Sequence, residues 1–198
     1  MRLRLASRSP RRAALLEAAG IAFVPGPWPS GEERLPADRA PAEAVAAVAA
    51  AKAREALAAA PDDVVLAADT LVFLDGQPLG KPRDGAEAEA FLRALSGRRH
   101  DVVTAVAVAW SRGGRPVVRT ACATTRVTFR PLRADGIAAH VASGEPLDKA
   151  GAYALQGGAR AFVAHIDGDE DTVIGLPIGL VRRLLAEVPG DPAPPGED

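Results

Sequence analysis

A carboxylate and a lysine stand on either side of a predicted turn in the middle of the chain. Asp69, with Thr70 beside it, interrupts an apolar run over 64–74 that is typical of a buried strand, and the pair at 75–76 predicts a hairpin turn. An unpaired charge is costly to bury. Asp69 therefore indicates a site that holds a metal or a water, a satisfied Asp–Thr pair, or a break in the strand. A hairpin would return Lys81 toward Asp69, where its ammonium suits an anion.

Two arginines, Arg11 and Arg12, stand in the first turn of a predicted helix. Ser9 is a natural N-cap, Pro10 suits the first helical position, and Gly20 suits the stop. Cations are locally unfavourable there, because a helix N-terminus attracts anions. Two arginines are explained if they face a polyanion, since the guanidinium binds phosphate through two hydrogen bonds. The pattern favours phosphate binding over two solvated side chains.

Further candidates lie in a helix and a loop. Lys52 falls within an alanine-rich helix predicted over 41–60, as a lysine reaching to solvent or as a cation facing a site. Glu32 and Glu33 lie in a Pro- and Gly-rich loop over 25–40. A paired glutamate in such a loop is usually solvated, and becomes a metal ligand only if the loop folds over a site.

Composition narrows the class of protein. The length of 198 residues suits one large or two small domains, and 48% hydrophobic with 25% charged residues predicts a folded globular chain. A net charge of −1 argues against a general nucleic-acid or membrane-surface binder. The single cysteine, Cys122, excludes an internal disulfide. No apolar stretch suits a secretory signal or a membrane span, so we expect a cytoplasmic protein.

The predicted fold combines strands and helices along the whole chain. Strands are expected at 3–6, 21–24, 64–74, 100–110, 117–129 and 161–166, and helices at 10–19, 41–60, 85–95, 134–142 and before 187. The Gly-Gly turn at 113–114 makes two long strands antiparallel, so the sheet is mixed. A polar, glycine-rich loop over 147–158 suits close approach to a ligand. The acidic turn at 167–171 lacks the closing glutamate of a calcium loop, and we expect 189–198 to be a disordered tail.

Taken together, short motifs along the chain resemble the Maf family of nucleoside triphosphate pyrophosphatases. Each motif is weak alone, but they occur in family order and cover nearly the whole chain before the tail. The motifs are Leu5-Ala6-Ser7-Arg8-Ser9-Pro10-Arg11-Arg12, Ala68-Asp69-Thr70, Gly80-Lys81-Pro82, Leu95-Ser96-Gly97, His100, Thr104-Ala105-Val106, Asp148-Lys149-Ala150-Gly151-Ala152-Tyr153, Gln156-Gly157 and Gly175-Leu176-Pro177.

The resemblance implies a fold and an activity. The implied fold is a mixed α/β domain over 1–188, with an elongated twisted sheet flanked by helices and a central cleft between two lobes. The implied activity is hydrolysis of a nucleoside triphosphate to the monophosphate and pyrophosphate, with Mg²⁺ or Mn²⁺, which would prevent misincorporation of the nucleotide. The expected partner is the nucleotide, with no nucleic acid or membrane, and a homodimer is left open.

The resemblance also implies roles for single residues. The position of Asp69 is the family's proton acceptor, and Asp69 with Glu32 would hold the metal, Glu33 being the alternative alignment. Because a metal-bound carboxylate is a poor base, the two roles of Asp69 compete. Substrate choice is linked to Arg11, Thr70 and Gln156. The phosphate site is lined by Ser7, Arg12, Lys52 and Lys81.

The subfamily is indicated by two segments. Ala-Asp-Thr at 68–70 and Lys-Ala-Gly-Ala-Tyr followed by Gln-Gly within 149–157 resemble the dTTP/UTP type. Members that act on 7-methyl-GTP typically carry Ser-Asp-Gln and Cys-Ala-Gly there. A different class of function, a nucleotide-binding regulator of septum formation and cell division without turnover, would need the cations but not Asp69.

Overall fold

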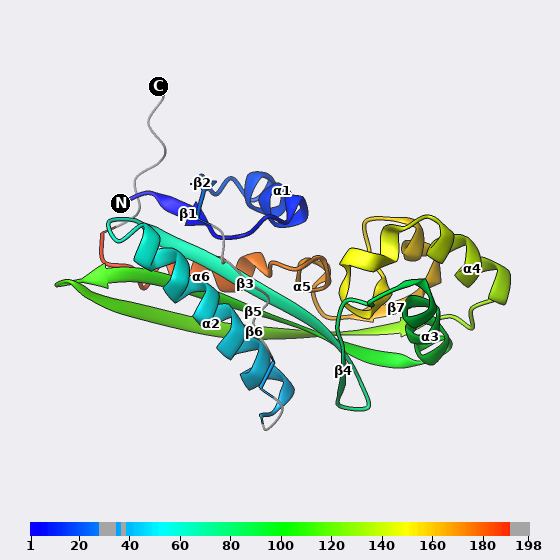
Figure 1. Ribbon diagram of the computed structural model, residues 1–198. Helices are drawn as coiled ribbons and strands as arrows, with labels where there is room; N and C mark the ends of the chain where they lie inside the picture. The colour runs from blue at the N-terminus through cyan, green and yellow to red at the C-terminus, as the bar shows by residue number, and fades with distance from the viewer. Residues whose placement is uncertain (28–34, 37–38, 191–198) are drawn as a thin grey trace. The chain divides into compact units, whose positions relative to one another are not determined.

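The computed structural model describes residues 1–27, 35–36 and 39–190 (Figure 1). The predictions for Glu32, for Glu33 and for the end of the tail at 191–198 lie outside these ranges. The chain divides into two compact units. The first draws on 1–69, 104–123 and 175–198, and the second on 70–103 and 124–174. The two units agree with the two lobes that the sequence predicts, while the boundaries of a single domain over 1–188 stay a prediction.

The described strands form one open, mixed sheet in the order β2-β1-β3-β5-β6-β7, with β4 paired to β3. β1 runs parallel to β2 and to β3, whereas β4 is antiparallel to β3 and β7 to β6. The predicted mixed α/β class is therefore confirmed. The strands are β1 (Leu3–Leu5), β2 (Val24–Pro25), β3 (Val64–Leu74), β4 (Gln77–Leu79), β5 (Arg99–Arg112), β6 (Arg115–Phe129) and β7 (Val163–Asp167).

Six α-helices and three short 3₁₀ helices are described, and long helices flank the sheet (Figure 1). None of them combines the length and the apolar character needed to traverse a bilayer. The α-helices are α1 (Pro10–Ala18), α2 (Pro41–Ala59), α3 (Gly85–Leu95), α4 (Ala134–Ala142), α5 (Glu170–Ile174) and α6 (Ile178–Leu185). The 3₁₀ helices are η1 (Glu145–Asp148), η2 (Ala150–Ala152) and η3 (Gly158–Phe162).

The first unit has its own apolar core. Leu16 of α1 and Val181 of α6 pack with Val64, Leu66 and Ala68 of β3. Because side chains alternate along a strand, the odd-numbered residues of this part of β3 face the other side of the sheet. The alanine-rich helix α2 lies on that side, since its Lys52 bonds the side chain of Asp69.

The second unit has a separate core built on aromatic residues. Phe129 of β6 makes edge-on contacts with His100 and Tyr153, at centroid distances of 4.9 and 4.8 Å. Leu92 of α3 and Ile137 of α4 pack in the same cluster. His100 Nε2 lies 2.8 Å from the Tyr153 hydroxyl, so these two buried polar atoms satisfy each other.

Several helix and strand boundaries differ from those predicted from the sequence. The strand expected at 21–24 is reduced to Val24–Pro25, because the Ile21 N–H donates to Leu16 O and closes α1 instead. The strand expected from 161 begins at Val163, since η3 occupies the residues before it. The acidic turn continues into helix α5 from Glu170.

Candidate active site

The candidate site of the first unit forms where β1 ends and its neighbour β3 continues. Leu5 pairs with Leu66 in a parallel ladder, and the Ala6 N–H donates to Leu66 O at 2.8 Å. β3 then runs on past the end of β1 and carries Asp69. The loop that leaves β1 leads into α1. Carboxyl ends of parallel strands are common places for ligands in α/β sheets.

The strand does not break at Asp69, which excludes one of the alternatives left open by the sequence. β3 is continuous over Val64–Leu74, and only Asp69, Thr70 and Leu71 are partly exposed within it. Lys52 of α2 donates to Asp69 Oδ1 at 2.5 Å, with side-chain exposures of 21% for Lys52 and 18% for Asp69. The half-buried carboxylate thus has a cation as its partner.

Arg12 is fixed by groups from both ends of the chain. Its Nε donates to Gly175 O at 2.9 Å and its Nη1 to Ser7 Oγ at 3.1 Å. Ser7 Oγ also accepts from the Ser9 N–H at 3.2 Å. Ser9 occupies the N-cap position as predicted, but its side chain makes no capping bond. Ser7 therefore orders the loop and the arginine together.

The charges around Arg12 are those of an anion site. Burial lowers the pKa of its guanidinium, the carboxylate of Asp69 opposes that shift, and the positive charge of Arg11 adds to it. Arg11 and Asp69 are therefore each close enough to Arg12 to influence its charge. An anionic ligand would compensate the desolvated guanidinium, because charge-assisted bonds to phosphate oxygens replace lost water.

Three predicted site residues belong to the second unit. Thr70 is half-buried, whereas Lys81 and Gln156 are exposed. The hairpin predicted after β3 is present, but β4 ends at Leu79, so Lys81 lies beyond the ladder. The roles of these three residues stay predictions.

Asp69 has the chemistry of a ligand for a hard cation. Lys52 bonds Oδ1, and Oδ2 offers a second carboxylate oxygen. In the described residues no three Asp, Glu, His or Cys side chains converge on one point. One carboxylate fits Mg²⁺ nonetheless, because this ion is usually held by one or two carboxylates together with substrate phosphates and water. Glu32, the second predicted ligand, is outside the described ranges.

The carbonyl of Gly175 is a site group that the sequence did not reveal. It accepts from Arg12, which is 163 positions earlier in the chain. Main-chain oxygens have no residue-type signature, so only the motif Gly175-Leu176-Pro177 before α6 could have drawn attention to it.

A cationic cluster beside a carboxylate, at the ends of parallel strands, defines a phosphate-binding class of α/β protein. The family model described as "Maf-like protein" matches residues 2–188, and the chain belongs to this family. A dTTP/UTP pyrophosphatase of Anaeromyxobacter dehalogenans is 47% identical over 193 residues, covering 98% of this chain and 96% of the relative. Proteins with the same name from Bacillus velezensis (45%, covering 94% and 96%) and Salmonella typhimurium (46%, covering 93% and 91%) are also similar.

Proposed function

We propose that the chain hydrolyses nucleoside triphosphates, dTTP and UTP above others, to the monophosphate and pyrophosphate. The observation that carries the proposal is the Lys52–Asp69 pair beside Ser7 and Arg12 at the end of β1. The names of relatives at 45–47% identity support the same reaction. They favour neither a regulator of septum formation nor a 7-methyl-GTP pyrophosphatase.

The cations account for binding and for transition-state stabilisation. A triphosphate carries several negative charges, and cleavage places more charge on the departing pyrophosphate. Arg12, held by Ser7 and Gly175, gives a fixed guanidinium, while Arg11, Lys52 and Lys81 add positive charge. Preorganised cations of this kind stabilise developing charge without reorganising during the reaction.

Asp69 would act as the proton acceptor. Lys52 bonds Oδ1 and thereby orients the carboxylate, so Oδ2 can accept a proton from the attacking water. The water oxygen forms a bond to the α-phosphorus, and the bond from that phosphorus to the oxygen bridging to the β-phosphorus breaks. The electron pair leaves with pyrophosphate, and the proton stays on Asp69.

A divalent metal, Mg²⁺ or Mn²⁺, would be held by Asp69 and Glu32, with Glu33 as the alternative. When bound, it would offset phosphate charge that the protein cations leave uncompensated. Because coordination weakens a carboxylate as a base, metal binding and proton acceptance compete at Asp69. Because the metal would compensate phosphate charge, we expect chelation by EDTA to stop pyrophosphate release and added Mg²⁺ or Mn²⁺ to restore it.

Base choice would rest on Thr70 and Gln156, with Arg11. A hydroxyl and a side-chain amide can pair with the acceptor and donor edge shared by thymine and uracil. A cytosine reverses the donor and acceptor at its amino group and would leave those groups unpaired.

Replacing Asp69 by asparagine tests the proposed role. Asp69→Asn keeps the shape and a hydrogen-bond acceptor for Lys52, but removes the charge of a base or metal ligand. We expect pyrophosphate release from dTTP to fall by at least about a thousandfold while the melting temperature changes little. Near-normal turnover by Asp69→Asn would remove Asp69 from the mechanism.

A further inference from the structure

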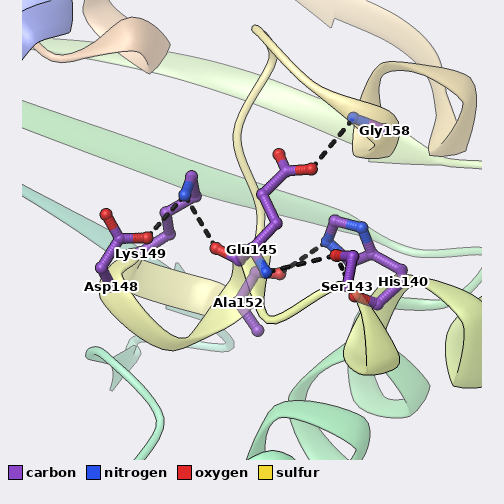
Figure 2. A network of polar contacts seen from close by, with 7 residues as sticks. All are labelled: His140, Ser143, Glu145, Asp148, Lys149, Ala152 and Gly158. Atoms are coloured by element: carbon purple, nitrogen blue, oxygen red, sulfur yellow. Dashed lines mark hydrogen bonds and ion pairs between the residues drawn. The ribbon is translucent and has the colours of Figure 1, made fainter.

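Glu145 is only partly exposed, and one of its two carboxylate oxygens is buried. It begins η1, after Gly144 in a left-handed conformation with φ of 73°. Its main chain is fixed at both ends: the N–H donates to Ser143 Oγ at 3.2 Å, and the carbonyl accepts from Lys149 Nζ at 2.7 Å. Figure 2 shows the side chain extending from this anchored backbone toward Gly158.

The carboxylate of Glu145 packs directly on the main chain of the Gln156–Gly158 turn. Oε2 accepts from the Gly158 N–H at 3.3 Å, and Oε1 is buried with no hydrogen-bond partner among the described residues. No described cation pairs with this carboxylate. The neighbouring Lys149 Nζ is bonded instead to Asp148 Oδ1 and to the Glu145 carbonyl (Figure 2). A carboxylate kept in this costly state indicates a positional role.

Gly157 leaves room for the Glu145 carboxylate where it now lies. A Cβ at position 157 would lie 1.9 Å from Glu145 Oε1, so a side chain there would force the Glu145 carboxylate out of its present position. The backbone itself makes no such demand, since φ is 173° and extended backbone accepts any residue. Carboxylate and turn are thus complementary in shape.

The segment before Gln156 is anchored independently. His140 Nε2 lies 3.3 Å from Ala152 O, and the Tyr153 hydroxyl lies 2.8 Å from His100 Nε2. Leu155 is buried and Gln156 is exposed. Gln156 therefore stands between a fixed buried segment on one side and the turn held by Glu145 on the other.

We propose that Glu145 is a positioning residue for base choice, which acts by fixing the Gln156–Gly158 turn and so the direction of the Gln156 amide. The inference rests on the proposed function, in which Gln156 helps to select the pyrimidine. Without the carboxylate, the turn loses its contact with η1 and the amide samples more directions. Discrimination between nucleotides should weaken more than turnover of the best one.

The test is the ratio of kcat/KM for UTP to that for CTP, measured for wild type and for Glu145→Ala. This ratio does not depend on how much enzyme is folded, because an unfolded fraction lowers both rates alike. We expect Glu145→Ala to lower the ratio by about tenfold. Glu145→Gln, whose amide oxygen can accept from Gly158, should restore it to within about threefold of wild type. Glu89→Ala, which removes a carboxylate paired with Arg93 on α3, is the control and should leave it unchanged.

The Gln156→Ala background identifies the route. Because Glu145 acts through Gln156, adding Glu145→Ala to Gln156→Ala should not lower the ratio further. Should Glu145→Ala fail to fold, Gly157→Ala displaces the same carboxylate and should also reduce the ratio. An unchanged ratio in Glu145→Ala, or in Gly157→Ala where that is the variant that folds, overturns the inference while leaving the proposed reaction intact. A wild-type protein that does not prefer UTP overturns the base choice on which the inference stands.

Discussion

At the level of single residues, the ion pair between Lys52 and Asp69 can be tested most directly. The pair is half-buried, with exposures near one fifth for both side chains. Lys52→Met leaves a carboxylate without its cation. We expect a loss of about 1–2 kcal/mol in the free energy of unfolding, between the values for exposed and for buried ion pairs. Urea unfolding measures this loss, and pyrophosphate release should fall at least about a hundredfold.

The double variant Lys52→Met/Asp69→Asn separates stability from activity. Removing both charges leaves no unpaired carboxylate, so most of the lost stability should return while the enzyme stays inactive. A double variant as unstable as Lys52→Met would show that the ion pair itself contributes nothing to folding.

His100 predicts a pH dependence of stability. Burial lowers its pKa from the ordinary value near 6.5 to about 4. Below pH 6.5 the unfolded chain takes up a proton that the folded chain resists. Stability from this group is therefore complete above pH 6.5 and is lost as the pH falls toward 4, by on the order of 3 kcal/mol. Urea unfolding at several pH values measures the loss.

His100→Gln is the matching variant, because glutamine can still hydrogen-bond Tyr153 but does not titrate. The difference in unfolding free energy between wild type and His100→Gln should narrow as the pH falls from 6.5 to 4. A difference that stays constant over this range would mean that His100 has an unperturbed pKa.

At the level of secondary-structure elements, the close packing of η2 predicts how much stability a substitution at Gly151 costs. Gly151 has φ of 66°, and a Cβ there would lie 2.8 Å from Val72 Cγ2. Gly151→Ala should lower the free energy of unfolding by about 2–3 kcal/mol, through backbone strain and overpacking together. Gly76→Ala is the control, since φ is 76° but nothing lies within 4 Å of its Cβ, and should cost about 1 kcal/mol.

Equal losses for the two glycine variants would contradict the packing of Gly151 against Val72. Thermal melting followed by far-UV circular dichroism suffices to compare them. The same packing fixes the loop before Lys81, because the Gly151 N–H donates to Gly80 O at 3.0 Å.

The elements that the sequence predicted well are those with local signals. The β-branched run ending at Asp75-Gly76 predicted β3 and its hairpin, and the Gly113-Gly114 turn predicted the long pair β5 and β6. The 3₁₀ helices η1, η2 and η3 were missed, and at η2 a contact between distant residues contributes that no local pattern shows. That contact is the bond from the Gly151 N–H to Gly80 O.

The site was predicted as far as residue type allows. Arg12, Lys52 and Asp69 carry charges that stand out against their surroundings, and the structure places them in one unit. The Gly175 carbonyl has no such signal. Glu145 has no such signal either, because nothing in the sequence shows that its side chain faces Gly157.

Over the whole molecule, the charged side chains are distributed unevenly. The net charge is only −1, yet Lys52 and Arg12 lie close to Asp69 in the first unit, and Arg11 lies close to Arg12. A local concentration of cations in a nearly neutral protein favours a small anion over a long polyanion such as nucleic acid. This agrees with a nucleotide substrate.

A panel of nucleoside triphosphates assayed for pyrophosphate release tests the central claim most directly. The panel contains dTTP, UTP, CTP, ATP, GTP and 7-methyl-GTP, and chromatography of the products identifies the bond that breaks. We predict that dTTP and UTP give the highest kcat/KM and that each yields its monophosphate and pyrophosphate. Release of orthophosphate alone, or 7-methyl-GTP as the best substrate, would contradict the account.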